Sequence, residues 1–400
     1  MRFEPGAPAG EDFVPLCVPE VREGSNEWAY VKECLDTNFV SSVGPFVNRF
    51  ESAMAKYVGV KHAVATVNGT AALHVALLVA GVEPDDEVLV STLTFIAPVN
   101  AIRYANAWPI FVDAESAYWQ MDAEKLRSFL EQRCSWSNGQ LRNRETGRRV
   151  RAIVPVHILG HPVDLDPILE LARKYQLAVI EDATESLGAR YKGRNVGTLG
   201  DLACLSFNGN KLITTGGGGM ILTDDDRLAA RARYLTTQAK DDPLEYIHGA
   251  IGFNYRLTNI LAALGCAQLE QIDAFIAAKR RIAETYRAAF SKVDGITAMP
   301  QAPWAESVFW LYTILVDRGQ YGADSRALLG LLERSKIQTR PLWQPIHLSI
   351  PHRGAPATDC SVAERLNAEA LSLPSSVGLT ADDQQRVISA MTARVTLAST

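Results

Sequence analysis

The chain has 400 residues, of which 47% are hydrophobic and 21% charged, which is ordinary for a protein large enough to form two globular domains. Its formal net charge of −5 gives no basic excess that would indicate nucleic acid as a partner. The six cysteines show no Cys-x-x-Cys pair and no metal-ligand spacing, so a cytoplasmic protein with reduced thiols is expected and no metal site is predicted. The N-terminal residues lack the apolar segment of a signal peptide and no apolar run reaches the length of a membrane span, so no membrane association is expected.

Residues 1–24 are rich in proline and glycine and are predicted to be extended. Beyond them, segments with helical spacing alternate with short apolar runs, which predicts an α/β fold with a parallel or mixed sheet and helices on both faces. The predicted helices are 26–35, 46–57, a helix that opens at residues 68–73, has Thr70 as its cap and ends at Gly81, 97–105, 122–132 and 166–175. The predicted strands are 61–67, 87–90, 109–112, 150–156, 177–180, 202–207 and 220–222. The arginines between residues 142 and 151 lie among turn residues and predict a solvated hairpin.

The character of the sequence changes after Thr258. Residues 259–290 form a long alanine-rich stretch with helical character, and a strand is predicted at 310–316. Further helices are predicted at 325–335, 362–371 and 381–397. We therefore expect a large mixed-sheet α/β domain over residues 1–260, including the N-terminal segment, and a smaller C-terminal α/β domain over residues 261–400.

Three polar features follow predicted strands, where open α/β sheets collect their ligands. Gly69 and Thr70 open a helix, whose free N–H groups and positive dipole end suit a phosphate, although many helices begin in this way. Asp182 follows an apolar strand and is either a cap for the next element or a carboxylate aimed at a buried cation. Lys211 is the only cation between Asp201 and Met220, and it is either a surface lysine on a hairpin or a desolvated amine able to act as a nucleophile.

These three features are the parts that a pyridoxal phosphate site needs. The cofactor requires a lysine that binds it covalently, a carboxylate that keeps the pyridine nitrogen protonated, and a pocket for the phosphate. A nucleotide-binding P-loop is the competing interpretation of glycines near a lysine, but its lysine follows the glycines, whereas the glycines at 216–219 come after Lys211. We expect these glycines to let the backbone turn closely behind Lys211, where a Cβ would crowd it.

Several motifs occur in an order and at spacings that together are specific. They are Ser-Ser-Val-Gly-Pro at 41–45, Asn-Gly-Thr-Ala-Ala-Leu at 68–73, Glu-Asp-Ala at 181–183, Ser-Phe-Asn-Gly-Asn-Lys at 206–211, Gly-Phe-Asn-Tyr-Arg at 252–256 and Arg-Pro-Leu-Trp-Gln-Pro-Ile-His at 340–347. Over nearly its whole length the chain resembles the DegT/DnrJ/EryC1/StrS sugar aminotransferases, which have fold type I of the pyridoxal phosphate enzymes. Within this family it looks most like the LegC-type subgroup, which typically acts on UDP-linked 4-keto-6-deoxy sugars with an acetamido group at C2. Related dehydratases carry a histidine in place of the lysine, so Lys211 favours amino transfer.

The resemblance assigns roles around the cofactor. Lys211 matches the catalytic lysine, Asp182 the partner of the pyridine nitrogen, and Phe95 the aromatic residue that stacks on the ring. Glu185 occupies a position often held by Gln or His facing the ring oxygen, where a carboxylate would repel a phenolate unless it is protonated or turned toward the substrate. The family implies a homodimer with shared active sites, and the implied phosphate contacts are Gly69, Thr70, Ser206 and Asn254 of the partner subunit.

The resemblance also implies contacts with the substrate. The sugar-nucleotide loop supplies Ser42, Gly44 and Pro45, and the diphosphate or the sugar is expected to meet Arg256, Arg340 and His347. Arginine suits a phosphate because its planar fork makes two charge-assisted hydrogen bonds. A surface salt bridge for Arg340 and a satisfied imidazole for His347 are the alternative interpretations.

The expected reaction is a ping-pong transfer of an amino group from L-glutamate to C4 of a nucleotide-linked 4-keto-6-deoxy sugar. The favoured acceptor is UDP-2-acetamido-4-keto-2,6-dideoxyhexose, in surface polysaccharide or glycan biosynthesis. Two alternatives stay open, namely a GDP-4-keto-6-deoxymannose 4-aminotransferase of the perosamine type and a non-catalytic regulatory protein that binds the cofactor.

Overall fold

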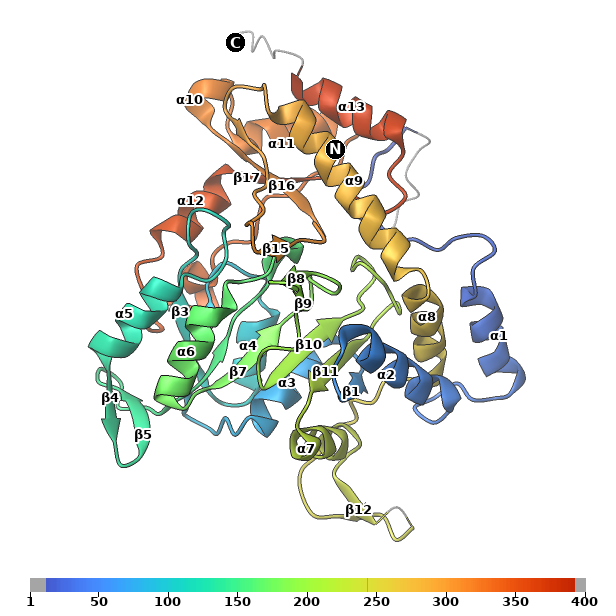
Figure 1. Cartoon of the computed structure of the whole chain (residues 1–400), viewed down its shortest axis with the longest axis vertical. Coiled ribbons are helices and arrows are strands. Elements are labelled where there is room, and N and C mark those ends of the chain that lie inside the picture. Colours follow the sequence, from blue (N-terminus) through green and yellow to red (C-terminus); the bar gives the residue numbers. More distant parts are fainter. Residues whose placement is uncertain (1–11, 243, 393–400) are drawn as a thin grey trace.

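A computed structural model describes residues 12–242 and 244–392 of the chain (Figure 1). A seven-stranded sheet forms the centre of the large domain, and a three-stranded sheet lies in the smaller domain at the top of Figure 1. Helices are interspersed with the strands along the chain, so the predicted α/β class is confirmed.

The large sheet is mixed, as predicted, and its strand order is β1-β11-β10-β7-β6-β2-β3. β11 runs antiparallel to both of its neighbours, whereas all pairs from β10 to β3 are parallel. Because β1 and β10 both pair with β11, Thr66 and Ser206 lie opposite Gly219 at one end of the sheet. The bounds are β1 (His62–Thr66), β2 (Glu87–Ser91), β3 (Trp108–Val112), β6 (Val150–Val154), β7 (Ala178–Asp182), β10 (Leu202–Ser206) and β11 (Gly219–Thr223).

Alternate side chains of these strands enter hydrophobic cores on opposite faces of the sheet. Val88 of β2 and Ile221 of β11 pack on the face covered by α3 (Gly69–Val79), α4 (Ala97–Tyr104) and α7 (Asp226–Thr236). On the other face, Leu89 packs with α5 (Ala123–Arg133) and α6 (Leu165–Tyr175). Leu222 packs on that same face with α2 (Pro45–Val58) and α8 (Asn259–Leu269). Both faces are therefore covered by helices, as a largely parallel sheet requires.

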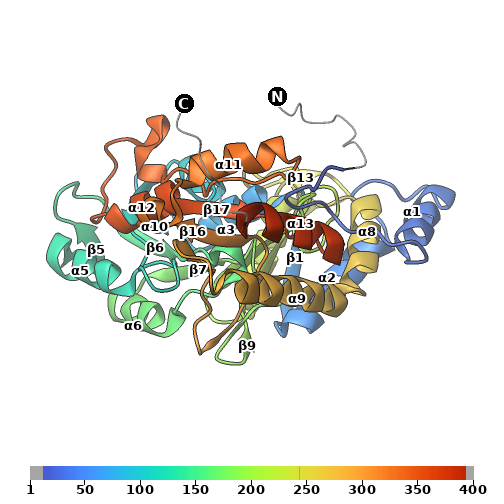
Figure 2. The same ribbon diagram turned by 90° about the horizontal axis from the view of Figure 1, so that it is seen from above.

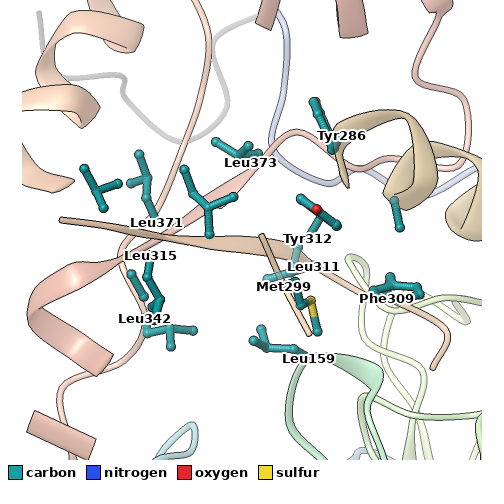
Figure 3. Close-up of a cluster of buried hydrophobic side chains, with 14 of the residues drawn as sticks. Leu159, Tyr286, Met299, Phe309, Leu311, Tyr312, Leu315, Leu342, Leu371 and Leu373 are labelled. Carbon is teal, nitrogen blue, oxygen red and sulfur yellow. The ribbon is translucent and has the colours of Figure 1, made fainter. Parts of the chain in front are cut away.

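Residues 272–392, which we call the smaller domain, contain a separate sheet, but the hydrophobic core beside it also takes in side chains of the preceding part of the chain, such as Leu93 and Trp119. β16 (Tyr312–Val316) runs antiparallel to β14 (Ile296–Thr297) and β17 (Ala370–Leu373). The helices of this part are α9 (Ile272–Phe290), α10 (Arg318–Tyr321), α11 (Ser325–Arg334), α12 (Ser361–Glu369) and α13 (Ala381–Thr392). Seen from above, α9, α11 and α13 lie over the large sheet (Figure 2). Figure 3 shows Leu159 of the large domain beside small-domain side chains such as Met299 and Leu311, so the apolar packing continues from one domain into the other.

Several chain segments connect the two domains. α8 packs against α1 (Glu27–Asp36) and α2, and after a 61° bend α9 continues into the smaller domain. Near the N-terminus, Val14 lies parallel to Ile337 of the smaller domain, and its N–H donates to the carbonyl oxygen of Lys336 at 2.9 Å. The division of the chain at residue 260 stays a prediction.

Short strands complete the structure, namely β4 (Cys134–Ser137), β5 (Gln140–Asn143), β8 (Arg190–Tyr191), β9 (Arg194–Asn195), β12 (Lys240–Asp242), β13 (Ile247–His248) and β15 (Ala305–Glu306).

Most predicted elements are present, and the differences have local causes. The helix predicted at 362–371 ends at Glu369, because residues 370–373 pair with β16. The predicted cap Thr70 is wrong, since the side chain of Asn68 accepts the N–H of Ala71 at 2.8 Å. Helix α7 was absent from the prediction. Residues 1–11 of the predicted extended segment and residues 393–397 of the last predicted helix lie outside the described residues.

Two global features complete the description. All six cysteines are free thiols. Between residues 12 and 392, leaving out 243, no single helix has both the length and the hydropathy needed to cross a membrane; α8 and α9 pass that test only as a bent pair.

Candidate active site

A cavity of about 470 Å³ lies where β7 and β10 end and where α3 and α4 begin, and residues of the smaller domain close it. This volume lies in the range of small-molecule and cofactor sites. The cavity brings together side chains that are far apart in sequence, because several strands of the mixed sheet end at this edge. The predicted site residues that line it are Gly69, Thr70, Phe95, Asp182, Glu185, Ser206, Lys211 and Arg340.

Lys211 lies in a tight turn shortly after β10, where its backbone N–H donates to the carbonyl oxygen of Asn208 at 2.9 Å. Its side chain is only 14% exposed. The Nζ atom lies 3.6 Å from Oε1 of Glu185 and 4.0 Å from the centroid of the Trp310 ring. The amine is therefore held between a carboxylate and an aromatic face at the wall of the cavity, rather than on a solvated hairpin.

Asp182 is the last residue of β7 and is buried. Its Oδ1 accepts the N–H of Thr184 at 3.1 Å. Burial raises the pKa of this carboxyl group, and the positive charge of Lys211 opposes part of that rise. A buried carboxylate of this kind is stabilised by a cationic partner in the cavity, such as a protonated ring nitrogen.

The neighbouring Glu181 shows what a structural acid looks like at the same strand end. Successive side chains of a strand point to opposite faces, so Glu181 faces away from Asp182 and contacts Nε2 of His157 at 3.1 Å. Because Nδ1 of His157 accepts the N–H of Val163, Nε2 carries the proton and donates it to Glu181. Burial alone would raise the pKa of Glu181, but His157 and backbone N–H groups, including that of Gly197, hold it below the ordinary value.

Glu185 lies three residues beyond Asp182 and is also buried. Its Oε2 accepts the N–H of Leu159 at 2.8 Å, and its Oε1 faces Lys211. Burial raises the pKa of Glu185 to about 7, although Lys211 and the Leu159 N–H act in the opposite direction. The carboxyl group can therefore be protonated near neutral pH, which removes the expected repulsion of a cofactor phenolate.

The turn into α3 forms a close-packed cradle. An ideal Cβ at Gly69 would lie only 2.9 Å from Cβ of Ser206, so glycine is needed for this approach. A Cβ at Gly219 would meet the backbone of Asn68 at 2.4 Å, and one at Gly218 would meet Oγ1 of Thr215 at 2.3 Å. The expectation that these glycines clear space behind Lys211 is therefore wrong. Gly219 lets β11 pass directly behind the Asn68–Gly69 backbone instead.

Aromatic side chains border the cavity. Phe95 lies just before α4 and is 53% exposed, so its ring is accessible to a planar group in the cavity. Trp310 and Trp343 also line the cavity and were missed from the sequence. Trp310 is fixed by a hydrogen bond from its indole Nε1 to the carbonyl oxygen of Asn210 at 2.7 Å. The sequence signal was a tryptophan at the start of a predicted strand, which by itself does not separate a core residue from a cavity wall.

The other predicted site residues do not line this cavity. Arg256 binds Glu51, with Nη1 and Oε1 2.5 Å apart. His347 contacts Oγ1 of Thr92 at 2.8 Å and Oε1 of Glu364 at 3.1 Å, a fully partnered imidazole. Ser42 and Gly44 belong to the loop before α2, Pro45 is the first residue of α2, and Asn254 is exposed on the segment after β13. Their roles stay predictions.

These residues fit pyridoxal phosphate. The donor set combines an amine, a buried acid and the N-terminal N–H groups of α3 beside Ser206, and the Gly69 approach leaves space that a Cβ would fill. Fold and cavity thus define a pyridoxal phosphate-dependent aminotransferase of fold type I. Residues 21–392 match the DegT/DnrJ/EryC1/StrS aminotransferase family, and the chain belongs to that family.

Comparisons with individual proteins agree with this membership. The chain is 42% identical to GDP-perosamine synthase of Caulobacter vibrioides over 381 residues, which cover 95% of this chain and 98% of the relative. It is 39% identical to GDP-perosamine synthase of Escherichia coli O157:H7 over 363 residues, covering 91% and 93%. The crystal structure of DesV from S. venezuelae superposes with a TM-score of 0.82 at 30% identity, covering 91% of this chain and 93% of that one. Family membership confirms the predicted sugar aminotransferase and favours an enzyme over a regulatory protein.

Proposed function

We propose that the enzyme transfers an amino group from L-glutamate to C4 of GDP-4-keto-6-deoxymannose. The observation that carries the transfer is Lys211, placed in one cavity with Asp182 and the Gly69–Ser206 cradle. The acceptor is supported by the two relatives named GDP-perosamine synthase, which match this chain over more than nine tenths of its length. They favour the perosamine type over the UDP-linked acetamido sugar of the LegC-type subgroup.

Each residue has a defined task in this proposal. Pyridoxal phosphate supplies an electrophilic carbon and a ring that accepts electrons. Lys211 would hold the cofactor covalently, and its free amine would carry a proton to and from the donor Cα. Asp182 would keep a proton on the ring nitrogen. Ser206 and the N–H groups at Gly69 and Thr70 would hold the phosphate.

The remaining wall residues orient and shield the reacting groups. Phe95 would cover one face of the cofactor ring, and Glu185 in its neutral form would be able to donate a hydrogen bond to the ring oxygen or the substrate. Arg340 lies at the exposed side of the cavity, where its guanidinium group can meet the donor carboxylate or the diphosphate. Positioned general base catalysis of this kind contributes about 10²–10⁴-fold to a rate.

The reaction is tested by supplying both candidate acceptors. Purified holoenzyme receives L-glutamate with either GDP-4-keto-6-deoxymannose or UDP-2-acetamido-4-keto-2,6-dideoxyhexose, and 2-oxoglutarate release and the amino sugar are measured. We expect kcat/KM for the GDP sugar to exceed that for the UDP sugar by at least about tenfold, which corresponds to about 1.4 kcal/mol. A preference for the UDP sugar would restore the LegC-type assignment, and failure of glutamate to convert the cofactor would remove the transfer itself.

We also propose a homodimer in which each subunit completes its partner's site. Asn254 is exposed and lies outside the cavity of its own chain. Near it, Leu244 is 82% exposed and Ile251 is 88% exposed, on the β12–β13 arm that projects from the bottom of Figure 1. Exposed apolar side chains on a projecting arm are typical of an interface. The arm would carry Asn254 of the partner subunit to the phosphate.

Mixed dimers test this arrangement. Lys211→Ala and Asn254→Asp are each expected to be almost inactive alone. In a mixed dimer, one of the two sites combines a native Lys211 with a native Asn254 and regains activity. Chains unfolded together and refolded should therefore recover a measurable fraction of wild-type turnover. Mixtures that form dimers without any gain in activity would show that each chain builds its site alone.

A further inference from the structure

A second cavity, of about 390 Å³, lies at the β3 edge of the large sheet and shares no lining residue with the active-site cavity. One wall is the segment 351–357, which covers the edge strand. The N–H of Phe111 donates to the carbonyl oxygen of Pro356, and the N–H of Thr358 donates to the carbonyl oxygen of Phe111, each at 2.9 Å. The cavity is therefore built between two backbone segments that are fixed to each other. We call it the arginine cleft, after its lining residues Arg103, Arg133, Arg148 and Arg353, which surround Trp108 and His352.

The charge of the arginine cleft is strongly positive, because Glu145 is its only acidic lining residue. Within the described part of the chain, no carboxylate lies within 4.0 Å of the guanidinium nitrogens of Arg103, Arg148 or Arg353. Arg149, next to Arg148, is by contrast paired with Asp86 in a double hydrogen bond. In a chain with a net charge of −5, a cleft that gathers unneutralised arginines indicates an anionic ligand.

The tryptophan at the base of the cleft fixes two of these arginines. The Cζ atoms of Arg103 and Arg148 lie 3.8 Å and 4.5 Å from the centroid of the Trp108 ring. The indole Nε1 of Trp108 is itself anchored to Oδ1 of Asp85 at 3.1 Å. Stacking on an aromatic ring orders a guanidinium group while leaving most of its in-plane N–H donors free for a ligand.

His352 adds an unsatisfied polar group to the same cleft. Its side chain is 94% buried, and no hydrogen-bond partner among the described residues meets its Nε2 atom. Such an atom costs free energy unless a ligand or water pairs with it. Burial and the charge of Arg103 lower the pKa of His352, so the imidazole is neutral at pH 7 and the positive charge comes from the arginines.

We propose that the arginine cleft binds a phosphorylated small molecule of nucleotide size, separately from the active site. A guanidinium group can donate two parallel hydrogen bonds to phosphate oxygens. Four guanidinium groups line the cleft, and three of them have no carboxylate partner among the described residues, whereas Arg133 is paired with Glu145 at 4.0 Å and donates to the carbonyl oxygen of Ala357. The cavity volume suits a nucleotide or a sugar phosphate, and Pro109 and Pro351 add apolar wall for a non-phosphate part. The hairpin predicted at residues 142–151 does form, since Arg142 bridges Arg149 in antiparallel fashion and the N–H of Gly147 donates to the carbonyl oxygen of Asn143, but Arg148 on this hairpin lines the cleft. The proposal does not depend on the identity of the amino acceptor.

Isothermal titration calorimetry on the holoenzyme tests the proposal, with GDP and inorganic pyrophosphate as probes. Because the active site is itself expected to bind GDP, the number of sites is the decisive quantity. We expect two GDP sites per chain in the wild type and one in Arg103→Gln/Arg148→Gln. Pyrophosphate affinity should fall about tenfold or more in this double variant, since two charge-assisted contacts are lost. Arg144→Gln is the matched control, because Arg144 is exposed on the same hairpin region and lies outside the cleft.

The outcomes separate the sources of the phosphate. Much tighter binding of GDP than of pyrophosphate at the cleft indicates a nucleotide, and equal binding indicates recognition of the phosphate alone; both support the proposal. Unchanged stoichiometry and pyrophosphate affinity in the double variant would overturn it, as would binding of heparin without either small anion. If the double variant does not fold, Arg353→Gln on the exposed segment provides the same test with one contact removed.

Discussion

Two lysines contact the same tryptophan and have opposite surroundings. Lys211 places its Nζ over the Trp310 ring at 4.0 Å and faces the cavity. Lys279 of α9 is fully buried, and its Nζ donates to the carbonyl oxygens of Trp310 and Ser375 and contacts Sγ of Cys17 at 3.6 Å. Burial lowers the pKa of Lys279, yet every donor direction of its amine is directed at protein atoms.

The difference shows that desolvation alone does not make a reactive amine. Lys279 connects α9 with the N-terminal segment, with the residues just before β16 and with the segment after β17, so it joins the N-terminal segment to the smaller domain. The amine of Lys211 stays available for chemistry, because the Trp310 ring and the protonatable Glu185 hold it without occupying all of its N–H donors. We therefore expect substitutions of Lys211 to remove chemistry and those of Lys279 to remove stability.

The largest effect is expected for Lys211→Ala. Loss of both the covalent attachment and the mobile proton should lower turnover by about 10⁴-fold or more. The free energy of unfolding of the apoenzyme should change little, because the amine makes few protein contacts. Absorbance of the bound cofactor and release of 2-oxoglutarate measure the first effect, and Lys192→Ala on an exposed turn is the control. If the Lys211→Ala variant keeps the yellow, bound cofactor and its activity, then Lys211 is not the catalytic lysine.

Lys279→Met should show the converse behaviour. Two buried carbonyl oxygens lose their donor, which should lower the free energy of unfolding by about 3 kcal/mol. The cofactor should still bind covalently, so the protein keeps its absorbance. Chemical denaturation measures the loss, and Lys292→Met at an exposed position is the matched control, with an expected change of about 0.5 kcal/mol or less. A stable Lys279→Met protein that fails to bind cofactor would contradict the comparison.

The acid beside Lys211 gives a prediction with a defined pH range. Because the pKa of Glu185 is raised from 4.5 to about 7 in the folded chain, the native state holds more protons than the unfolded state between these values. Stability contributed by this group therefore decreases as pH rises from 4.5 to 7. Glu185→Gln in the apoenzyme should be more stable than the wild type by about 3 kcal/mol well above pH 7 and equal to it below pH 4.5. Thermal unfolding across this range measures the difference, and a difference independent of pH would exclude titration of Glu185.

The smallest effect is expected for Trp310→Phe. The phenyl ring keeps an aromatic face for Lys211 but loses the hydrogen bond to the carbonyl oxygen of Asn210. We expect kcat/KM to fall about threefold to tenfold with the cofactor still bound. Trp136→Phe, on the exposed hairpin, is the control. No change in either variant would show that Trp310 serves the core alone.

Parts of the site that depend on local sequence could be predicted. Asp182 ends an apolar strand and Lys211 lies in the turn that follows another, and the end of a strand in an α/β sheet is recognisable from its neighbours. Trp310 could not be placed, because its contact with Lys211 exists only when the smaller domain folds against the larger one. The same holds for residues 370–373, whose pairing with β16 overrides the helical propensity of the preceding segment.

Helix α7 was not predicted, although its sequence carries a local helix signal. α7 begins at an Asp225 cap that accepts the N–H groups of Arg227 and Leu228, and its buried side chains recur at helical spacing at Ala229, Ala232 and Leu235. The arginine cleft had no such signal. Its residues come from α4, β3, the end of α5 and the two segments 145–148 and 351–357, and only the closed sheet edge brings them together.

The pairing of Thr66 and Ser206 with Gly219 has a consequence for how the enzyme is made. The turn proposed to hold the phosphate is shaped by β11, which pairs with β10 nearby in sequence and with β1 from far along the chain. The pairing of β1 with β11 is expected to form slowly, because a long loop must close before this pairing stabilises the chain. We expect the chain to collapse before it can capture its cofactor, so that return of the yellow colour during refolding trails the recovery of helical circular dichroism. Newly synthesised enzyme would then pass through an empty, protease-sensitive stage whose lifetime is set by a single late-inserting strand.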